Sequence, residues 1–149
     1  MELLQCNCSF LRSATRALSL AYDEVLRPSG LRITQFSMLA RASAVGEMPL
    51  SELADLMAMD RTTLARNLQP LEREGLVEIK VGRDRRARLV SVTPVGQKVL
   101  TNAMPLWESV HQRFEQKFGK RESKDLRHTL KRIVTVGREL SAENETVIE

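Results

Sequence analysis

The sequence predicts a mostly α-helical protein with one small antiparallel β-hairpin. Apolar residues recur at helical spacings over most of the 149 residues, whereas strand-like alternation is confined to residues 77–92. The composition, 42% hydrophobic and 28% charged, is typical of a folded globular chain. Because the length suits about one hydrophobic core, we expect a single domain over residues 1–149.

Two helices are predicted in the first third of the chain. From Leu4 to Leu26, apolar residues recur every three, four or seven positions, and a proline and a glycine follow. A shorter helix carries Phe36 on its apolar face. Thr34 is its expected N-cap, and residues 46–49 break it.

Two more short helices are expected to meet at a tight turn. Ser51 and Asp60 each stand at an expected N-cap, and residues 57–59 leave room only for the turn. Gly75 ends the second helix, where a left-handed conformation is favoured. The apolar face of that helix is formed by Leu64, Leu68 and Leu71.

The pattern then changes to that of two antiparallel strands. Residues 77–81 and 89–92 are rich in β-branched side chains. The loop between them, residues 82–88, holds four arginines and one aspartate, so we expect it to project as a charged hairpin.

Two long helices are expected after the hairpin. Thr93 as N-cap and Pro94 at the first helical position begin a helix that Gly119 ends. A last helix carries apolar residues from 126 to 140, and residues 141–149 are expected to be a frayed tail.

The positive charge of the chain is concentrated in residues 61–100. This window holds nine basic and four acidic residues, whereas the rest of the chain has a net charge of −1. Most of the nine bases are arginines, whose planar guanidinium suits phosphates and base edges. A solvated surface is the alternative, but nucleic acid is the better match for one local cluster.

Helix, tight turn, helix and basic hairpin together make a winged helix-turn-helix. The second helix of the pair would enter the major groove, with Arg66 as the candidate for a forked contact to guanine. The hairpin tip is thin enough for the minor groove. Asp84 either orients a neighbouring arginine through a charge-assisted bond or forms the turn itself. The expected DNA-binding residues are Arg61, Thr62, Thr63, Arg66, Asn67, Lys80, Arg83, Arg85, Arg86 and Arg88.

Five segments resemble the MarR family of bacterial transcription regulators: residues 49–54, 60–66, 71–77, 84–86 and 92–96. The resemblance implies a winged-helix DNA-binding part at about residues 31–98 and dimerisation helices at 1–30 and 99–141. It also implies a homodimer on a palindromic operator, acting as a repressor that a small molecule or an oxidant releases. Ala65 departs from the family pattern, because many members have threonine there.

The apolar residues of the terminal helices favour a dimer independently of the family resemblance. The first and last helices carry long apolar stripes, which a single chain with few aromatic residues would leave partly exposed. Pairing two copies would bury them. The alternative is that the stripes pack on each other within one chain.

Other functions find less support in the residues. No glycine loop for phosphate, nucleophile elbow or partnered histidine is present, so we expect neither an enzyme nor a cofactor. The two cysteines form no zinc motif, and we expect reduced thiols, no metal and a cytoplasmic protein without membrane spans. The main rival is a winged helix that contacts only protein, which would not need an arginine-rich hairpin.

Two places in the sequence are candidates for receiving the signal that releases the protein from DNA. An effector pocket is expected from the family, and its candidates, each of which has an ordinary packing or surface role as alternative, are Arg16, Tyr22, Phe36, Trp107 and His111. Residues 8–22 are similar to the first helix of the organic-hydroperoxide-sensing branch, in which Cys8 falls at the position of the reactive cysteine. Arg12 and Phe36 replace tyrosines of that branch. Cys8 is therefore either an oxidant sensor or a small apolar filler in a dimer interface.

Overall fold

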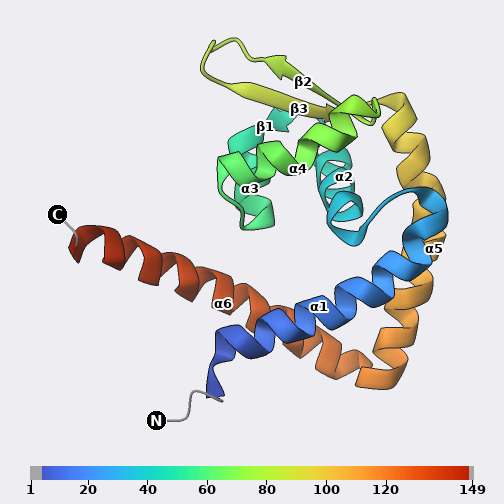
Figure 1. Cartoon of the computed structure of the whole chain (residues 1–149), viewed down its shortest axis with the longest axis vertical. Helices are drawn as coiled ribbons and strands as arrows, with labels where there is room; N and C mark the ends of the chain where they lie inside the picture. The colour runs from blue at the N-terminus through green and yellow to red at the C-terminus, as the bar shows by residue number, and fades with distance from the viewer. Residues whose placement is uncertain (1–4, 148–149) are drawn as a thin grey trace. The chain divides into compact units, whose positions relative to one another are not determined.

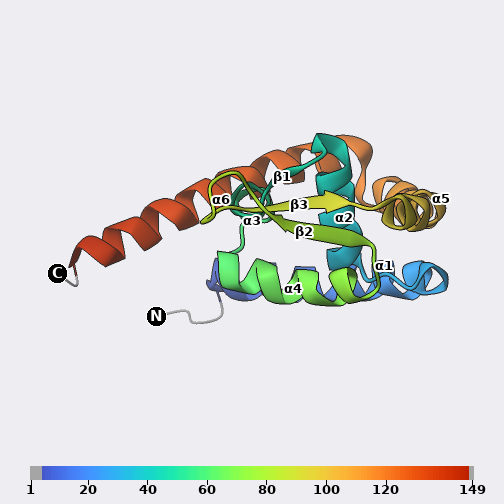
Figure 2. The same ribbon diagram turned by 90° about the horizontal axis from the view of Figure 1, so that it is seen from above.

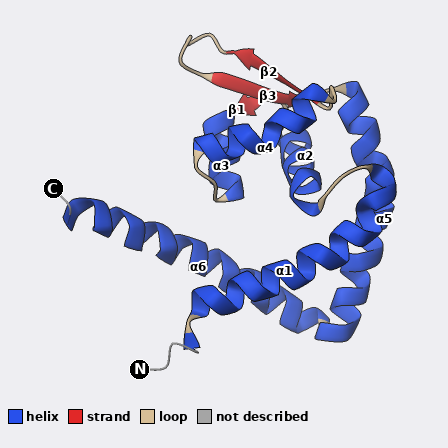
Figure 3. Cartoon of the chain, in the orientation of Figure 1, coloured by secondary structure: helices blue, strands red, loops and turns tan. Residues whose placement is uncertain are grey.

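The computed structural model describes residues 5–147 of the chain (Figure 1). The predicted start of the first helix at Leu4 lies outside these residues. The chain divides into two compact units, Met1–Val110 and His111–Glu149, and each is described by itself below. Helices predominate in both units, and the strands belong to the first (Figure 3). The predicted fold class, mostly helical with a small antiparallel sheet, is confirmed.

The first unit begins with α1 (Asn7–Leu26), a short 3-10 helix (Arg27–Ser29) and α2 (Ile33–Val45). The prediction of Thr34 as the cap of α2 is wrong, because the helix begins one residue before it. Its first amides are bonded instead by Asp23, whose Oδ1 accepts from the Ile33 amide at 2.7 Å, and by Gln35, whose Oε1 accepts from the Arg32 amide at 3.0 Å. One of these partners comes from α1 and the other from α2 itself. Neither is a Ser or Thr that directly precedes the helix, which is the usual sequence signal for an N-cap.

The predicted pair of short helices is present as α3 (Leu50–Met57) and α4 (Arg61–Arg73). Ala58 makes the turn between them in a left-handed conformation, with φ of 51°. Ser51 is not an N-cap, because α3 begins at Leu50 after the extended backbone of Pro49. The predicted cap at Asp60 is confirmed.

Three strands form an antiparallel sheet in the order β1-β3-β2. β2 (Val77–Val81) pairs along its length with β3 (Arg88–Val92), and β1 (Met48–Pro49) pairs with the other edge of β3. β1 was not predicted, since two residues are too few for alternation to be visible and Pro49 argues against a strand. At a sheet edge a proline is tolerated, because its missing N–H faces away from the ladder.

The core of the first unit lies between the helices and the sheet. Leu64, Leu68 and Leu71 of α4 are at most 1% exposed, as their spacing predicted. They pack in one cluster with Leu39 of α2 and Val90 of β3. Figure 2 shows α4 running alongside β2 and β3. This packing fixes which side of α4 faces solvent.

The first unit continues into α5 (Pro94–Phe118), which begins as predicted with Thr93 as its cap. The amide of Gly96 donates to Thr93 Oγ1 at 3.0 Å. Gly96 is buried, and a side chain there would collide with the backbone of Leu76. The start of α5 is therefore packed directly on the entry to β2.

The second unit contains the end of α5 and α6 (Lys120–Val147), joined at Gly119 with φ of 108°. Glu115 Oε1 contacts both His111 Nε2, at 3.4 Å, and Arg127 Nη1, at 3.3 Å, which ties the two helices together. The predicted frayed tail is wrong up to residue 147, because α6 continues through it; residues 141–147 contain no proline or glycine to stop a helix. Within the described residues, no helix is long and apolar enough to cross a membrane.

Candidate nucleic-acid interface

The beginning of α4 is organised by Asp60. Its Oδ1 accepts a hydrogen bond from the backbone amide of Thr63 at 2.8 Å, and its Oδ2 accepts one from the Thr63 hydroxyl at 2.6 Å. The side-chain bond from Thr63, followed by the backbone bond, lowers the pKa of the Asp60 carboxyl below its ordinary value. The cap is therefore ionised at neutral pH, and it holds the Thr63 side chain in one orientation.

Besides Thr63, the solvent-facing side of α4 carries four exposed residues near its beginning: Arg61, Thr62, Ala65 and Arg66. Neither guanidinium forms an ion pair or a hydrogen bond among residues 5–147. Since the opposite side of the helix is buried in the core, these side chains have a defined direction and no internal partner. That is the arrangement expected of a helix that reads an external ligand.

Asn67 lies one turn further along α4 and is half-buried. Its Nδ2 donates to the backbone carbonyl of Thr63 at 2.8 Å. One of its amide hydrogens is therefore already used within the helix, which distinguishes it from the arginines beside it.

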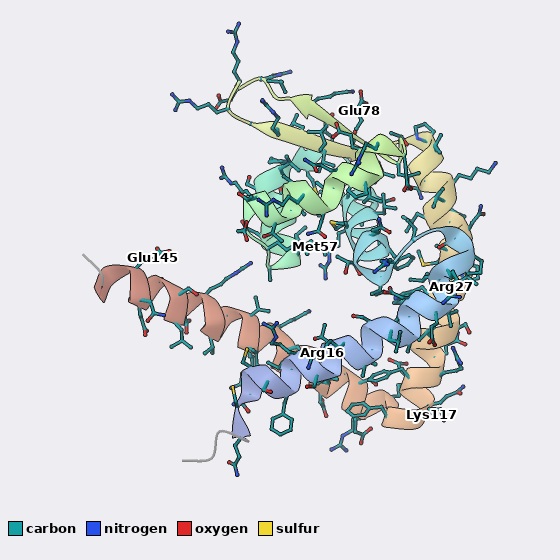
Figure 4. The ribbon with its side chains drawn as sticks, in the orientation of Figure 1. Arg16, Arg27, Met57, Glu78, Lys117 and Glu145 are labelled. Carbon is teal, nitrogen blue, oxygen red and sulfur yellow. The ribbon has the colours of Figure 1, made fainter. Side chains whose placement is uncertain are left out.

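The hairpin between β2 and β3 presents the predicted arginines to solvent. Arg83, Arg85, Arg86 and Arg88 are all exposed, and nitrogen-tipped side chains project from the hairpin loop in Figure 4. Lys80 differs, because its Nζ lies 3.2 Å from Glu78 Oε2 on the same strand. The positive charge is thus densest at the tip.

The turn at the hairpin tip is held by backbone and side-chain bonds. Asp84 Oδ1 accepts from the Arg86 amide at 3.1 Å, and the Asp84 carbonyl accepts from the Ala87 amide at 2.9 Å. Arg88 Nη1 donates to the carbonyl of Arg85 at 3.2 Å. Of the two roles considered for Asp84, the structure therefore shows the turn-forming bond, and its carboxylate makes no ion pair among the described residues.

A groove of about 560 Å³ lies between α4 and the hairpin. Arg61, Thr62 and Ala65 form one wall, and Arg86 and Arg88 belong to the other. Pro49, Leu50 and Ser51 also line the groove, although the sequence interpretation did not assign them to the site. The missed strand β1 explains this, because it brings the start of α3 beside the hairpin.

The candidates for an effector pocket do not all come together. The rings of Phe36 and Trp107 are stacked, with centroids 5.7 Å apart, and Tyr22 packs against the same core. Arg16 is exposed on α1, where it donates to Ser13 Oγ at 3.0 Å (Figure 4). His111 belongs to the second unit and contacts Glu115. The structure therefore joins three of the five residues in one packed cluster of the first unit.

Cys6 and Cys8 flank the first residue of α1. Both are free thiols, and both are exposed in the single chain. Cys8 lies in the first turn of the helix, at the positive end of the helix dipole.

Comparison with known proteins gives consistent matches. The model of the MarR family matches residues 31–87. An uncharacterised HTH-type transcriptional regulator of Bacillus subtilis, YwoH, is 28% identical over 88 residues, which are 59% of this chain and 64% of that protein. The matched region therefore spans under two thirds of this relative.

Solved structures match over almost the whole chain. The M. tuberculosis transcriptional regulator MosR in complex with DNA is 37% identical, covers 91% of this chain and 98% of its own, and superposes with a TM-score of 0.83. The transcriptional repressor CouR bound to a 23-mer DNA duplex is 25% identical, covers 89% and 94%, and has a TM-score of 0.76.

Proposed function

This chain belongs to the MarR family of transcription regulators, and we propose that it acts as a homodimeric repressor that a small molecule or an oxidant releases from a palindromic operator. Its role as a DNA-binding regulator follows from the family. The observation that most directly supports DNA binding is the arrangement of α4. This helix is anchored in the core, and its free arginines face solvent beside an arginine-rich hairpin.

The two basic elements are expected to do different work on DNA. Side chains near the beginning of α4 would contact base edges in the major groove, where Arg66 suits the two acceptors of guanine. The hairpin tip would contact the minor groove and the backbone, because arginine is attracted to the negative potential there. Asp84 would keep the turn in shape without itself contacting DNA, since its carboxylate is engaged with the Arg86 amide.

The proposed dimer is supported by the apolar surface of the terminal helices. Phe10 and Leu20 of α1 are 63% and 62% exposed. On α6, the exposed apolar residues are Leu130, Ile133, Val134, Val136 and Leu140. Exposed apolar stripes on two long helices are costly in water, and a second copy of the chain is the partner that would cover both.

The signal that releases the repressor is either a small molecule or an oxidant, and the two would act at different places. A small molecule would act near the cluster of Tyr22, Phe36 and Trp107, where a change in packing reaches α2 and α5. An oxidant would act at Cys8, which is exposed near the start of α1. The organic-hydroperoxide-sensing role belongs to the second possibility.

The test is sedimentation followed by footprinting on genomic fragments. We expect a dimer that protects a pseudo-palindrome whose half-sites lie about 10 to 10.5 base pairs apart, because two symmetric helices must enter successive major grooves on one face. A protein-interaction module would leave every fragment unprotected. A monomer that protects one unpaired half-site would overturn the dimer but not the DNA binding.

A further inference from the structure

We propose that the Thr63 hydroxyl reads the major groove as a hydrogen-bond acceptor, and that it thereby selects adenine or cytosine at one position of each operator half-site. The inference rests on the proposed function, because it assigns a direction to one contact of α4. Thr63 lies in the first turn of that helix and is exposed. The polarity of its hydroxyl is set by Asp60.

The Thr63 hydroxyl has one hydrogen, and its hydrogen-bond partner determines where that hydrogen points. Thr63 Oγ1 lies 2.6 Å from Asp60 Oδ2. An ionised carboxylate has no hydrogen to give, so the Thr63 hydroxyl must be the donor in this bond. The lowered pKa of the Asp60 carboxyl keeps it ionised. What remains on Thr63 Oγ1 is lone-pair density, which can only accept.

An acceptor discriminates between bases in the major groove. Adenine and cytosine present amino groups there, at N6 and N4, whereas guanine O6 and thymine O4 are acceptors. An amino group would complete a hydrogen bond with Thr63 Oγ1. A keto oxygen would meet lone pairs with lone pairs and would lose its bond to water in exchange for none.

The same geometry directs Thr63 to a base rather than to a phosphate. The free amides at a helix N-terminus ordinarily attract phosphate. Here Asp60 already occupies the Thr63 amide and adds a negative charge. A phosphate would be repelled by the carboxylate and by the acceptor hydroxyl together, so phosphate contacts are left to the arginines.

Two variants test the polarity while keeping the helix cap. Thr63→Val is nearly isosteric and retains the backbone amide that Asp60 accepts, but it removes the hydroxyl. Asp60→Asn retains a good N-cap residue. Its amide can donate to Thr63 Oγ1, which would free the Thr63 hydrogen and turn the hydroxyl into an outward donor. Thr101→Val, which removes a hydroxyl bonded to the Gln97 carbonyl on α5, is the matched control.

The experiment is selection of duplexes from a randomised library by the full-length protein and each variant. We expect the wild-type protein and Thr101→Val to enrich adenine or cytosine at one position per half-site, and Thr63→Val to lose the preference there alone. Asp60→Asn should shift that position towards guanine or thymine. Replacing the selected amino base by its analogue without the amino group should weaken wild-type binding about tenfold and Thr63→Val binding hardly at all.

The outcomes separate this inference from the proposed function. If the wild-type protein enriches no sequence, the proposed function itself fails. If it enriches a defined operator and Thr63→Val enriches the same one with unchanged base frequencies, the proposed function stands and the reading by Thr63 is wrong. A keto base at the position that Thr63→Val relaxes would also overturn it.

Discussion

The hydroxyl of Thr93 donates a 2.5 Å hydrogen bond to the backbone carbonyl of Gly75, eighteen residues earlier in the chain. The same oxygen accepts from the Gly96 amide, and the Thr93 amide donates to the carbonyl of Leu76 at 3.0 Å. One residue therefore caps α5 and joins its first turn to the end of α4. The orientation of α4 depends on this junction as well as on the leucines beneath it.

Thr93→Val should destabilise the first unit by about 1 to 2 kcal/mol, because it removes the N-cap acceptor and the bond to Gly75 while keeping the side-chain volume. Urea unfolding of the purified protein measures the change. Thr101→Val removes a hydroxyl from an exposed position inside α5 and should cost well under half as much. Equal losses in the two variants would contradict the special role of Thr93.

Gly96→Ala should be more damaging than a helical substitution usually is. A Cβ on Gly96 would overlap the Leu76 carbonyl oxygen and lie 2.9 Å from Val92 Cγ1, so α5 would have to shift off the sheet. We expect a loss of about 2 kcal/mol or more, despite the higher helix propensity of alanine. Gly137→Ala is the control, since a Cβ there meets nothing within 4 Å of the single chain. A neutral Gly96→Ala would show that the junction is loose.

The sequence predicted the elements best where several local signals agreed. At Asp60, a capping residue, a following polar turn and the leucine spacing all indicated the same helix start, and the structure has it there. At Thr34 a favourable capping residue was misleading, because Asp23 of α1 and Gln35 had already satisfied the first amides of α2. Such a tertiary bond leaves no trace in the local pattern.

The candidate site was predictable in its residue types but not in its geometry. The arginine cluster in the sequence predicted that α4 and the hairpin would form the DNA-binding surface. The contribution of Leu50 and Ser51 to the lining of the groove depends on the pairing of β1 with β3, a long-range contact made by two residues. The direction of the Thr63 hydroxyl likewise depends on a single side-chain bond.

Arg66→Ala should weaken binding to the operator by about 1 to 3 kcal/mol and relax the preference for one base, because it removes a base-edge contact. Replacing Arg85 and Arg86 together should instead weaken binding to all sequences and flatten its salt dependence, because fewer counterions are released. Titrations on operator and random duplexes at several salt concentrations distinguish the two effects. If both variants lose equal affinity on both duplexes, the division of work between α4 and the hairpin is wrong.

The stability conferred by Asp60 should depend on pH in a defined direction. Its pKa is lower in the folded protein than the ordinary value of 3.8, chiefly because the Thr63 side chain and amide bond the ionised form. The contribution is therefore fully present above pH 3.8 and is lost as the pH falls through the lower, folded-state pKa. Melting curves of the wild-type protein and Asp60→Asn should converge as the pH is lowered into that range. A gap that widens on acidification would contradict the assignment.

The two roles considered for Cys8 predict different responses to an organic hydroperoxide. As a sensor, the Cys8 thiolate would attack the peroxide oxygen, giving a sulfenic acid and the corresponding alcohol once a proton is taken up. As an apolar filler in a dimer interface, Cys8 would contribute packing without any reaction that alters DNA binding. Its position in the first turn of α1 and its exposure in the single chain make the reaction sterically open.

A stoichiometric organic hydroperoxide should therefore be added to the protein–operator complex, with oxidation followed by mass spectrometry and release by gel shift. If Cys8 is the sensor, the wild-type protein and Cys6→Ser release the operator, whereas Cys8→Ser stays bound. Cys6→Ser is the matched control, because Cys6 is also an exposed thiol and lies two residues away. Unchanged DNA binding by wild-type protein whose Cys8 is shown to be oxidised would reject the sensor. The release signal would then be a small ligand acting elsewhere, and the cluster of Phe36 and Trp107 would be the first place to test.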